Sequence, residues 1–379
     1  MNRSDNRILT THIGSLPRSL ELLDADPATL KQAVDEIVAR QVDTGIDVIT
    51  DGELSKPSFI TYINDRVDGI TVHHHTAEEP DAFWMRTREA EMFPEYYEQL
   101  TKDLSGAAAT FEGDVETLGP LRYTGHKLLQ RDIDNLKAAA AKAGAPAENL
   151  FMPSTSVTEV EGIFRNSYYS TEEEHLYAIA EVMHEEYKTI VEAGLLLQVD
   201  DPTLVTHWIL APNESLADTR RWAQLRVDAL NHALRGIPEE RVRYHTCYSV
   251  DMGPRVHDLE LKDIVDIILN INAGAYSFEA ANPRHEHEWR VWKEAKLPDN
   301  KILIPGTITH STVVVEHPDL VAERIIRFAN VVGRDRVIAG ADCGFSSIAG
   351  AAGVHASIVW AKLAALVEGA RRASEQLWA

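Results

Sequence analysis

Eight short apolar segments, separated by longer amphipathic patterns, recur along the whole chain. This alternation predicts parallel strands joined by helices, because parallel neighbours need a crossover connection that is usually helical. The expected strands are Leu9–Gly14, Asp47–Thr50, Asn149–Pro153, Leu195–Val199, Val242–Cys247, Ala275–Glu279, Lys301–Pro305 and Arg336–Ala341. Eight such units predict an α/β fold, a closed (β/α)8 TIM barrel, built as one domain over residues 1–379.

Two of the expected helices carry start signals. Asp26 precedes Pro27, which gives an N-cap residue followed by proline at the first helical position. Thr171–Glu174 has the spacing of a capping box, and apolar residues then recur at helical spacing until Gly194. These apolar stripes are expected to pack on the barrel.

One connection is much longer than the others. Residues 54–148, approximately, lie between the second and third expected strands, and we predict that this insertion has structure of its own. A helical excursion is expected over 81–104 and an extended piece over 117–123, which could count as a ninth strand. The histidines at 73–75 fall in this insertion and are expected in a solvated loop. Long loops of this kind often form lids or dimer surfaces, which leaves a homo-oligomer open.

Composition excludes several partners. The chain has 37 Lys+Arg against 59 Asp+Glu, a net charge of −22, which repels phosphate backbones and anionic membrane surfaces. Nucleic acid and membrane are therefore not expected as partners. The polar N-terminal residues lack the apolar core of a secretory signal, so we expect a cytoplasmic protein.

The two cysteines of the chain stand at the carboxyl ends of expected strands. His245 and Cys247 are two residues apart, so on a strand they face the same side. Cys343 can add a second thiolate from another strand, and Glu279 can add a carboxylate. This donor set fits Zn²⁺, which accepts sulfur, nitrogen and oxygen in tetrahedral geometry. The alternatives are two inert buried cysteines or, less readily, a disulfide.

Six motifs occur in the order found in a known family. The chain resembles the catalytic C-terminal barrel of cobalamin-independent methionine synthase over essentially its whole length. The matching motifs are Thr10–Arg18, Asp51–Glu53, Val199–Pro202, His245–Ser249, Ser277–Glu279 and Ala341–Gly344. The resemblance implies a catalytic barrel that holds zinc through His245, Cys247, Glu279 and Cys343.

The same resemblance implies a site for a thiol substrate. Glu53 and Asp200 would hold the amino group of homocysteine, and paired carboxylates suit an ammonium group. The backbone of Ile13 and Gly14, with the backbone and hydroxyl of Ser15, would hold its carboxylate, since a turn of free N–H groups suits an anion. The catalytic histidine of the family has only an offset counterpart here. That counterpart is His310, within the sequence Thr309–Ser311.

Three functions stay open at this point. The favoured one is zinc-dependent alkylation of a thiol, with transfer of a methyl group to homocysteine. The second is an epoxyalkane:coenzyme M transferase, which would need cations such as Arg18, Lys56 or Arg284 to receive a sulfonate. The third is a barrel whose zinc is purely structural. His285 and His287 could orient zinc ligands or substrate, or belong to a polar loop.

Two-barrel members of the family are about twice as long as this chain. The half that helps to bind folate is absent from this sequence, so the alkyl donor stays undetermined.

Overall fold

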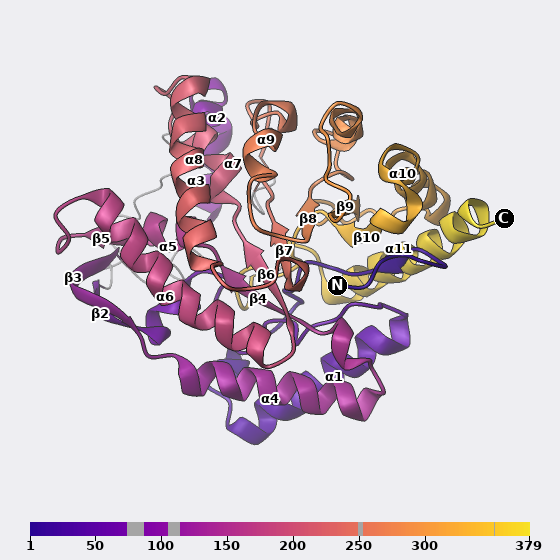
Figure 1. Ribbon diagram of the computed structural model, residues 1–379, viewed down its shortest axis with the longest axis horizontal. Coiled ribbons are helices and arrows are strands. Elements are labelled where there is room, and N and C mark those ends of the chain that lie inside the picture. The colour runs from indigo at the N-terminus through magenta and orange to yellow at the C-terminus, as the bar shows by residue number, and fades with distance from the viewer. Residues whose placement is uncertain (74–86, 105–113, 249–252, 352) are drawn as a thin grey trace.

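A parallel sheet of seven strands is the centre of the structure (Figure 1), a computed structural model that describes residues 1–73, 87–104, 114–248, 253–351 and 353–379. The strand order is β1-β10-β9-β8-β7-β6-β4. The strands are β1 (Leu9–Thr10), β4 (Phe151–Thr155), β6 (Leu196–Asp200), β7 (Val242–His245), β8 (Ala275–Phe278), β9 (Ile302–Ile308) and β10 (Ile338–Ala341). All pairings in this sheet are parallel, as the sequence predicts.

The two edges of this sheet approach the same short segment. Thr11 forms a parallel bridge to Val48, and Ile49 forms one to Leu150. The expected strand Asp47–Thr50 is therefore represented by two single bridges, and it lies between β1 and β4. The curled parallel sheet with its helices is a TIM-barrel-like α/β fold.

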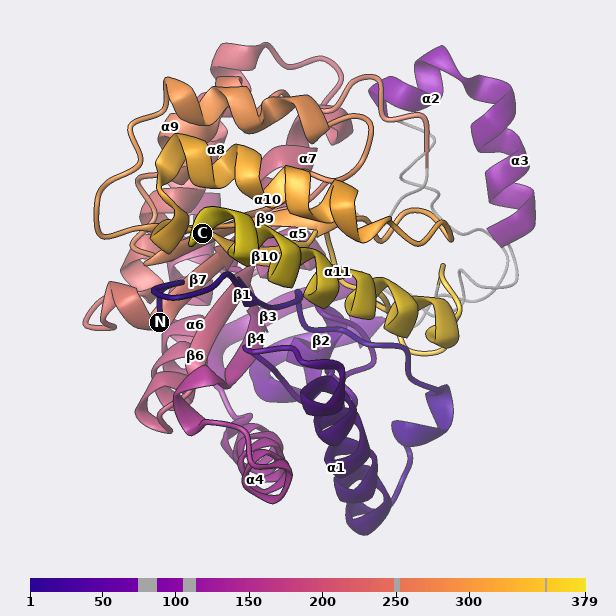
Figure 2. The ribbon, with the colours of Figure 1, turned by 90° about the vertical axis from the view of Figure 1, so that its right-hand side faces the viewer.

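Long helices cover the outside of the sheet (Figures 1 and 2). They are α1 (Pro27–Thr44), α4 (His126–Ala143), α6 (Glu172–Glu192), α8 (Leu216–Ala233), α10 (Pro318–Val332) and α11 (Ala356–Leu377). Shorter helices are α5 (Val157–Ile163), α7 (Thr203–Leu210) and α9 (Val265–Ile268), and a 3₁₀ helix spans Glu286–Lys293. Among the described residues, no helix combines the length and the apolar composition needed to cross a membrane.

The two residues predicted to begin helices, Asp26 and Thr171, are the N-cap residues of α1 and α6. The Asp26 carboxylate accepts hydrogen bonds from the N–H groups of Ala28 and Thr29 at the start of α1. The Thr171 hydroxyl accepts one from the N–H of Glu174 at the start of α6, while the Glu174 carboxylate accepts from the N–H of Ser170, so only half of the predicted capping box forms. The apolar stripe of α6 is buried against the sheet, at Leu176, Ile179, Met183, Tyr187 and Ile190.

A second, smaller sheet stands beside the first. It consists of β2 (Val67–His73), β3 (Asp114–Tyr123) and β5 (Phe164–Asn166) in the order β2-β3-β5. The extended piece predicted over 117–123 is therefore a strand, but it joins this sheet and not the central one. His73 is an exposed residue that bonds to Glu116, while 74 and 75 lie outside the described residues.

The predicted helical excursion corresponds to two helices, α2 (Arg88–Met92) and α3 (Pro94–Leu104), while residues 81–86 lie outside the described part. The two helices form one corner of the molecule (Figure 2). Arg88 fixes α2 to α7, because its guanidinium donates to the backbone carbonyls of Trp208, Ala211 and Glu214.

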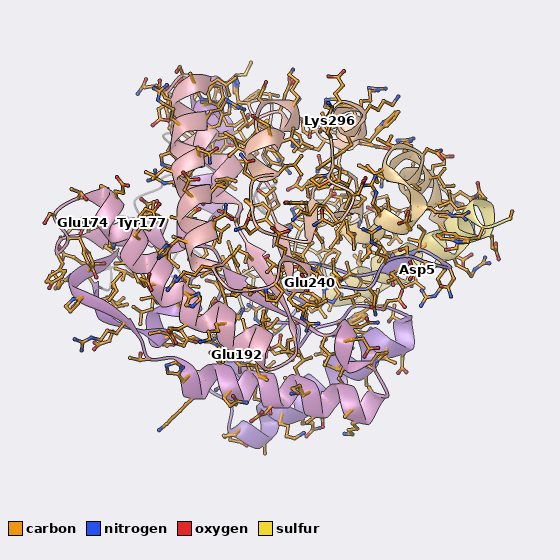
Figure 3. All side chains as sticks on the ribbon, in the orientation of Figure 1. Asp5, Glu174, Tyr177, Glu192, Glu240 and Lys296 are labelled. Atoms are coloured by element: carbon orange, nitrogen blue, oxygen red, sulfur yellow. The ribbon has the colours of Figure 1, made fainter. Side chains whose placement is uncertain are left out.

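Part of the acidic excess lies on the outer surface. Glu174, Glu192 and Glu240 are exposed, and Glu174 stands at one edge of the molecule in Figure 3. The charge of −22 is therefore carried at least in part by solvated carboxylates, a pattern that keeps proteins soluble and selects no particular reaction.

Candidate active site

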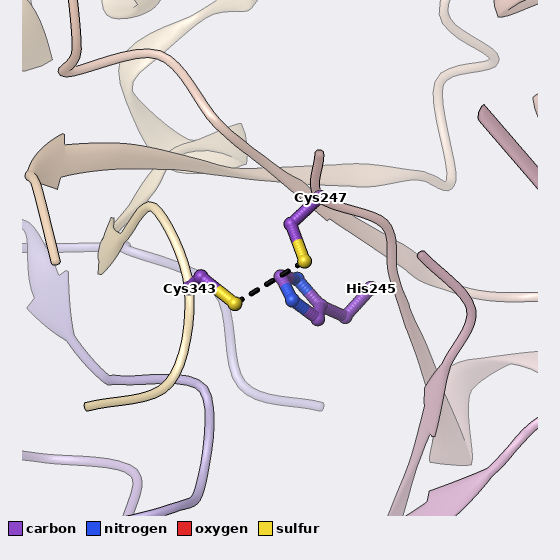
Figure 4. A group of neighbouring side chains, drawn as sticks. All are labelled: His245, Cys247 and Cys343. Carbon is purple, nitrogen blue, oxygen red and sulfur yellow. Dashed lines mark hydrogen bonds between the residues drawn. The ribbon is translucent and has the colours of Figure 1, made fainter. Parts of the chain in front are cut away.

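The two cysteines and one histidine meet at the carboxyl end of the central sheet (Figure 4). His245 is the last residue of β7, Cys247 follows it by two positions, and Cys343 comes two residues after β10. One potential ligand atom from each lies within 4.8 Å of the other two. The two sulfur atoms are 3.2 Å apart, and both cysteines are free and buried. The disulfide alternative is therefore not seen.

The imidazole of His245 is suited to be a neutral metal ligand. Burial, together with the charges of Arg243 and His310, lowers its pKa to about 3. Neither ring nitrogen has a hydrogen-bond partner among the described residues, although the side chain is buried. A buried imidazole without partners next to two thiols is the donor chemistry that Zn²⁺ accepts, so the residues present fit this metal.

The carboxylate of Glu279 lies outside this group of three. Its Oε1 accepts the N–H of Tyr248 at 2.8 Å. Its Oε2 accepts from Arg255 at 2.8 Å and from Asn282 at 2.6 Å. The structure thus brings together three of the four expected ligands, and the role of Glu279 as fourth ligand stays a prediction.

A cavity beside the cysteines collects most of the expected substrate residues. Its lining consists of Ile13, Ser15, Glu53, Phe59, Asp200, Pro202, His245, Cys247, Cys343, Gly344 and Ser347. Sequence reasoning missed Phe59 and Ser347, which lie in loops without a distinctive pattern. Pro202 and Gly344 were part of recognised motifs, but their motifs did not assign them a role.

Glu53 and Asp200 form a buried pair of carboxyl groups in this cavity. Burial raises the pKa of Asp200 well above its ordinary value, and the charge of Glu53 raises it further. The Glu53 Oε2 atom has no hydrogen-bond partner within the described residues, and the Glu53 backbone has a φ of 58°. A strained backbone that aims an unpaired carboxylate into a cavity is typical of a binding residue.

The free energy of unfolding should depend on this pair. The pKa of Asp200 is higher in the folded state than in the unfolded state, so protonation of Asp200 stabilises the folded state. This stabilisation is complete at pH values below the pKa of the unfolded state, and it is lost as the pH rises through the pKa of the folded state. We predict that Asp200→Asn is more stable than the wild type by on the order of 1 kcal/mol at neutral pH, with a smaller difference near pH 4. Urea unfolding at several pH values measures this. A pH-independent difference would contradict the prediction.

The expected anion-binding turn at residues 13–15 is held by the buried side chains of His12 and Gln41. Gly14 has a φ of 138°, and its N–H donates to His12 Nδ1 at 3.2 Å. His12 Nε2 bonds to Gln41 Oε1 at 2.8 Å, and burial lowers the His12 pKa to about 4, so the ring is neutral. The Gly14 N–H is therefore already used, while the Ser15 N–H donates no bond within the described residues. Ser15 is the better placed of the two for a substrate carboxylate.

Position 344 requires glycine because its backbone lies very close to the Ser15 side chain. A Cβ atom at position 344 would lie 2.1 Å from Ser15 Oγ, so the Ser15 side chain would have to move. We predict that Gly344→Ala weakens binding of a carboxylate-bearing thiol by about tenfold, since small displacements at a binding site have large effects. Isothermal titration checks this. Gly162→Ala is the matched control, because its Cβ would meet nothing within 4 Å.

His310 follows β9 and is buried near the other site residues. Its charge adds to the burial that lowers the pKa of His245 and opposes the burial that raises the pKa of Asp342, which places His310 close to both residues. It is not part of the cavity lining. Its catalytic role stays a prediction.

The three cationic side chains that could receive the sulfonate of coenzyme M are bonded to backbone carbonyls. Arg18 donates to the backbone carbonyls of Lys56 and Ser346. The Lys56 ammonium donates to the Pro153 carbonyl at 2.7 Å. Arg284 is exposed and donates to the Val256 carbonyl. None of the three belongs to the described lining of the cavity.

Fold and site together define a TIM-barrel-like α/β protein with a buried cysteine and histidine group at the carboxyl ends of its strands. The chain belongs to the cobalamin-independent synthase family, whose catalytic-domain model matches residues 95–368. The resemblance read from the motifs is thereby confirmed.

Curated relatives agree with this membership, and a solved structure shares the fold. The methionine synthase of Sulfurisphaera tokodaii is 24% identical over 384 residues, covering 97% of this chain and 93% of its own. That of Sulfolobus acidocaldarius is 22% identical over 279 residues, covering 69% and 68%. A B12-independent methionine synthase from Shewanella, solved in complex with selenomethionine, superimposes with a TM-score of 0.71 at 17% identity, covering 98% and 99%. At this identity the superposition shows the fold.

Proposed function

We propose that this protein is a zinc-dependent transferase that alkylates a thiol, and that it transfers a methyl group to homocysteine to form methionine. The observation that carries the proposal is the cavity in which two carboxyl groups face a cysteine and histidine group. The family and its curated methionine synthases support the same activity.

Zn²⁺ would be held by His245, Cys247 and Cys343, with Glu279 as the exchangeable fourth ligand. When bound there, the metal would supply a positive charge that favours thiolate over thiol at neutral pH. Two cysteinates make such a site electron-rich, which keeps a thiolate nucleophilic. His245 is held neutral by burial and thus can donate a lone pair.

The remaining residues bind and orient the amino acid part of the substrate. Glu53 and Asp200 receive the ammonium group, which relieves the repulsion between the two carboxylates. The Ser15 hydroxyl and N–H receive the carboxylate. These two contacts fix the direction in which the thiol reaches toward Cys247 and Cys343. We assign to His310 the movement of a proton during turnover.

The two other functions are less well supported. A coenzyme M transferase would have to place a sulfonate near Glu53 and Asp200, with no cation in the described lining of the cavity. A purely structural zinc would not need an adjoining cavity with an unpaired buried carboxylate. Both remain as outcomes of the test.

Competition between thiols tests the proposal. Zinc-loaded protein is titrated with homocysteine and with coenzyme M, and methionine is assayed with methylcobalamin and with methyltetrahydrofolate as trial donors. We expect homocysteine to bind at least about tenfold more tightly, since the sulfonate thiol has no contact for its charge. Tighter binding of coenzyme M would favour the epoxide reaction. Binding of neither thiol would favour the structural role.

We also propose that the sheet closes as a single (β/α)8 barrel through residues 47–50. The insertion expected over about 54–148 would then end before α4, because α4 packs along α1 as a barrel helix does. The cytoplasmic location and the homo-oligomer stay predictions.

A further inference from the structure

The Glu279 carboxylate is held by an arginine with an unusual backbone. Arg255 has a φ of 56°, a conformation that is costly for a residue with a Cβ atom. Its guanidinium donates to Glu279 Oε2 at 2.8 Å, and both side chains are buried. The contacts of this side chain must therefore compensate for the strain.

A chain of buried charged groups holds Arg255 in place. Its Nε donates to Asp258 Oδ2 at 2.9 Å, and the same oxygen bonds to His285 Nε2 at 2.9 Å. His285 Nδ1 bonds to Glu288 at 2.7 Å. Burial opposes the charge of His285, but Asp258 and Glu288 raise its pKa to about 9. The ring is therefore a cation that fixes Asp258, and the exposed His287 takes no part in this chain.

The same chain touches the segment that carries Cys247. The Tyr248 N–H donates to Glu279 Oε1 at 2.8 Å, and the Tyr248 ring stacks on His285 with centroids 3.9 Å apart. Glu279 thus has a complete set of partners while it is away from the three potential metal ligands.

We propose that Arg255 is a positioning residue that receives the Glu279 carboxylate when a thiol substrate takes the fourth position at the metal. This rests on the function proposed above. In this exchange the thiolate sulfur would replace the Glu279 carboxylate at a zinc held by His245, Cys247 and Cys343, and the thiol proton would leave to water. The Glu279 carboxylate would pass from one cationic partner to another, so it would have a charged partner in both positions.

The variant Arg255→Met tests this, because it keeps the length of the side chain and removes the cation. Without Arg255, the metal is the better partner for Glu279. We expect zinc release to a chelator to slow by about tenfold and the Kd for homocysteine to rise by about tenfold, the range seen for groups that support metal ligands. The double variant Arg255→Met with Glu279→Gln should bind homocysteine as tightly as Glu279→Gln alone, because Arg255 acts through the Glu279 carboxylate. Arg284→Met, an exposed arginine nearby, is the control.

Slower zinc release separates this role from structural damage, which would speed release. If Arg255→Met fails to fold, Asp258→Asn loosens the same guanidinium and should shift both quantities in the same direction. Zinc release at the wild-type rate together with no restoration in the double variant would overturn the proposal. Failure of the proposed function would look different, because zinc-loaded wild-type protein would then not bind homocysteine at all.

Discussion

Cys247→Ser and Cys343→Ser should each lose both zinc and turnover. A serine hydroxyl does not ionise at neutral pH and is a poor ligand for a borderline-soft ion, so two ligands alone would remain from the group of three. Turnover should fall by more than about a hundredfold, since even loss of an outer partner of a metal ligand costs 10–100-fold. Zinc content by atomic absorption and methionine formation measure the two effects.

Thr246→Ser is the matched control for this pair of variants. Thr246 stands between His245 and Cys247, and its hydroxyl donates to the Asp201 carbonyl, a bond that serine can keep. The control should retain zinc and activity. A Cys247→Ser or Cys343→Ser protein that stays zinc-loaded and fully active would refute the assignment of the site.

Glu53→Gln and Asp200→Asn should each weaken homocysteine binding by about 10–100-fold without loss of zinc. Each removes one charge-assisted hydrogen bond to the ammonium group, and such bonds contribute about 1.5–3 kcal/mol. The two carboxyl groups act on the same ammonium, so the double variant should lose less than the sum of the two. Isothermal titration of the zinc-loaded proteins gives the affinities.

An analogue of homocysteine that lacks the amino group supplies the control for this prediction. Wild-type protein should bind it much more weakly than homocysteine, and the variants should lose most of this preference. If Glu53→Gln and Asp200→Asn still discriminate between the two thiols as the wild type does, the ammonium is bound elsewhere.

The metal group could be predicted because strand ends obey a simple rule. The carboxyl ends of parallel strands lie at one edge of the sheet, and the curl of a barrel-like sheet brings ligands after β7 and β10 together although β8 and β9 stand between them. The short segment at 47–50 was predicted as a full strand, but it pairs through single bridges only. The sequence pattern locates such a segment, but its apolar residues do not show how many backbone hydrogen bonds it forms with the neighbouring strands.

The loops could not be predicted in the same way. The Glu279 carboxylate is paired with Arg255, which lies in a loop whose sequence has no pattern that points to a buried ion pair. The positive φ values at Glu53 and Arg255 have no sequence signal, because neither is a glycine. The need for Gly344 follows from the position of Ser15, more than 300 residues away in the chain.

X-ray absorption at the zinc edge tests the central claim most directly. Purified protein is measured alone, with homocysteine and with coenzyme M. We predict two sulfur ligands in the protein alone and a third with homocysteine, while coenzyme M leaves the shell unchanged. A shell that does not respond to either thiol, or protein that binds no zinc, would contradict thiol activation at His245, Cys247 and Cys343.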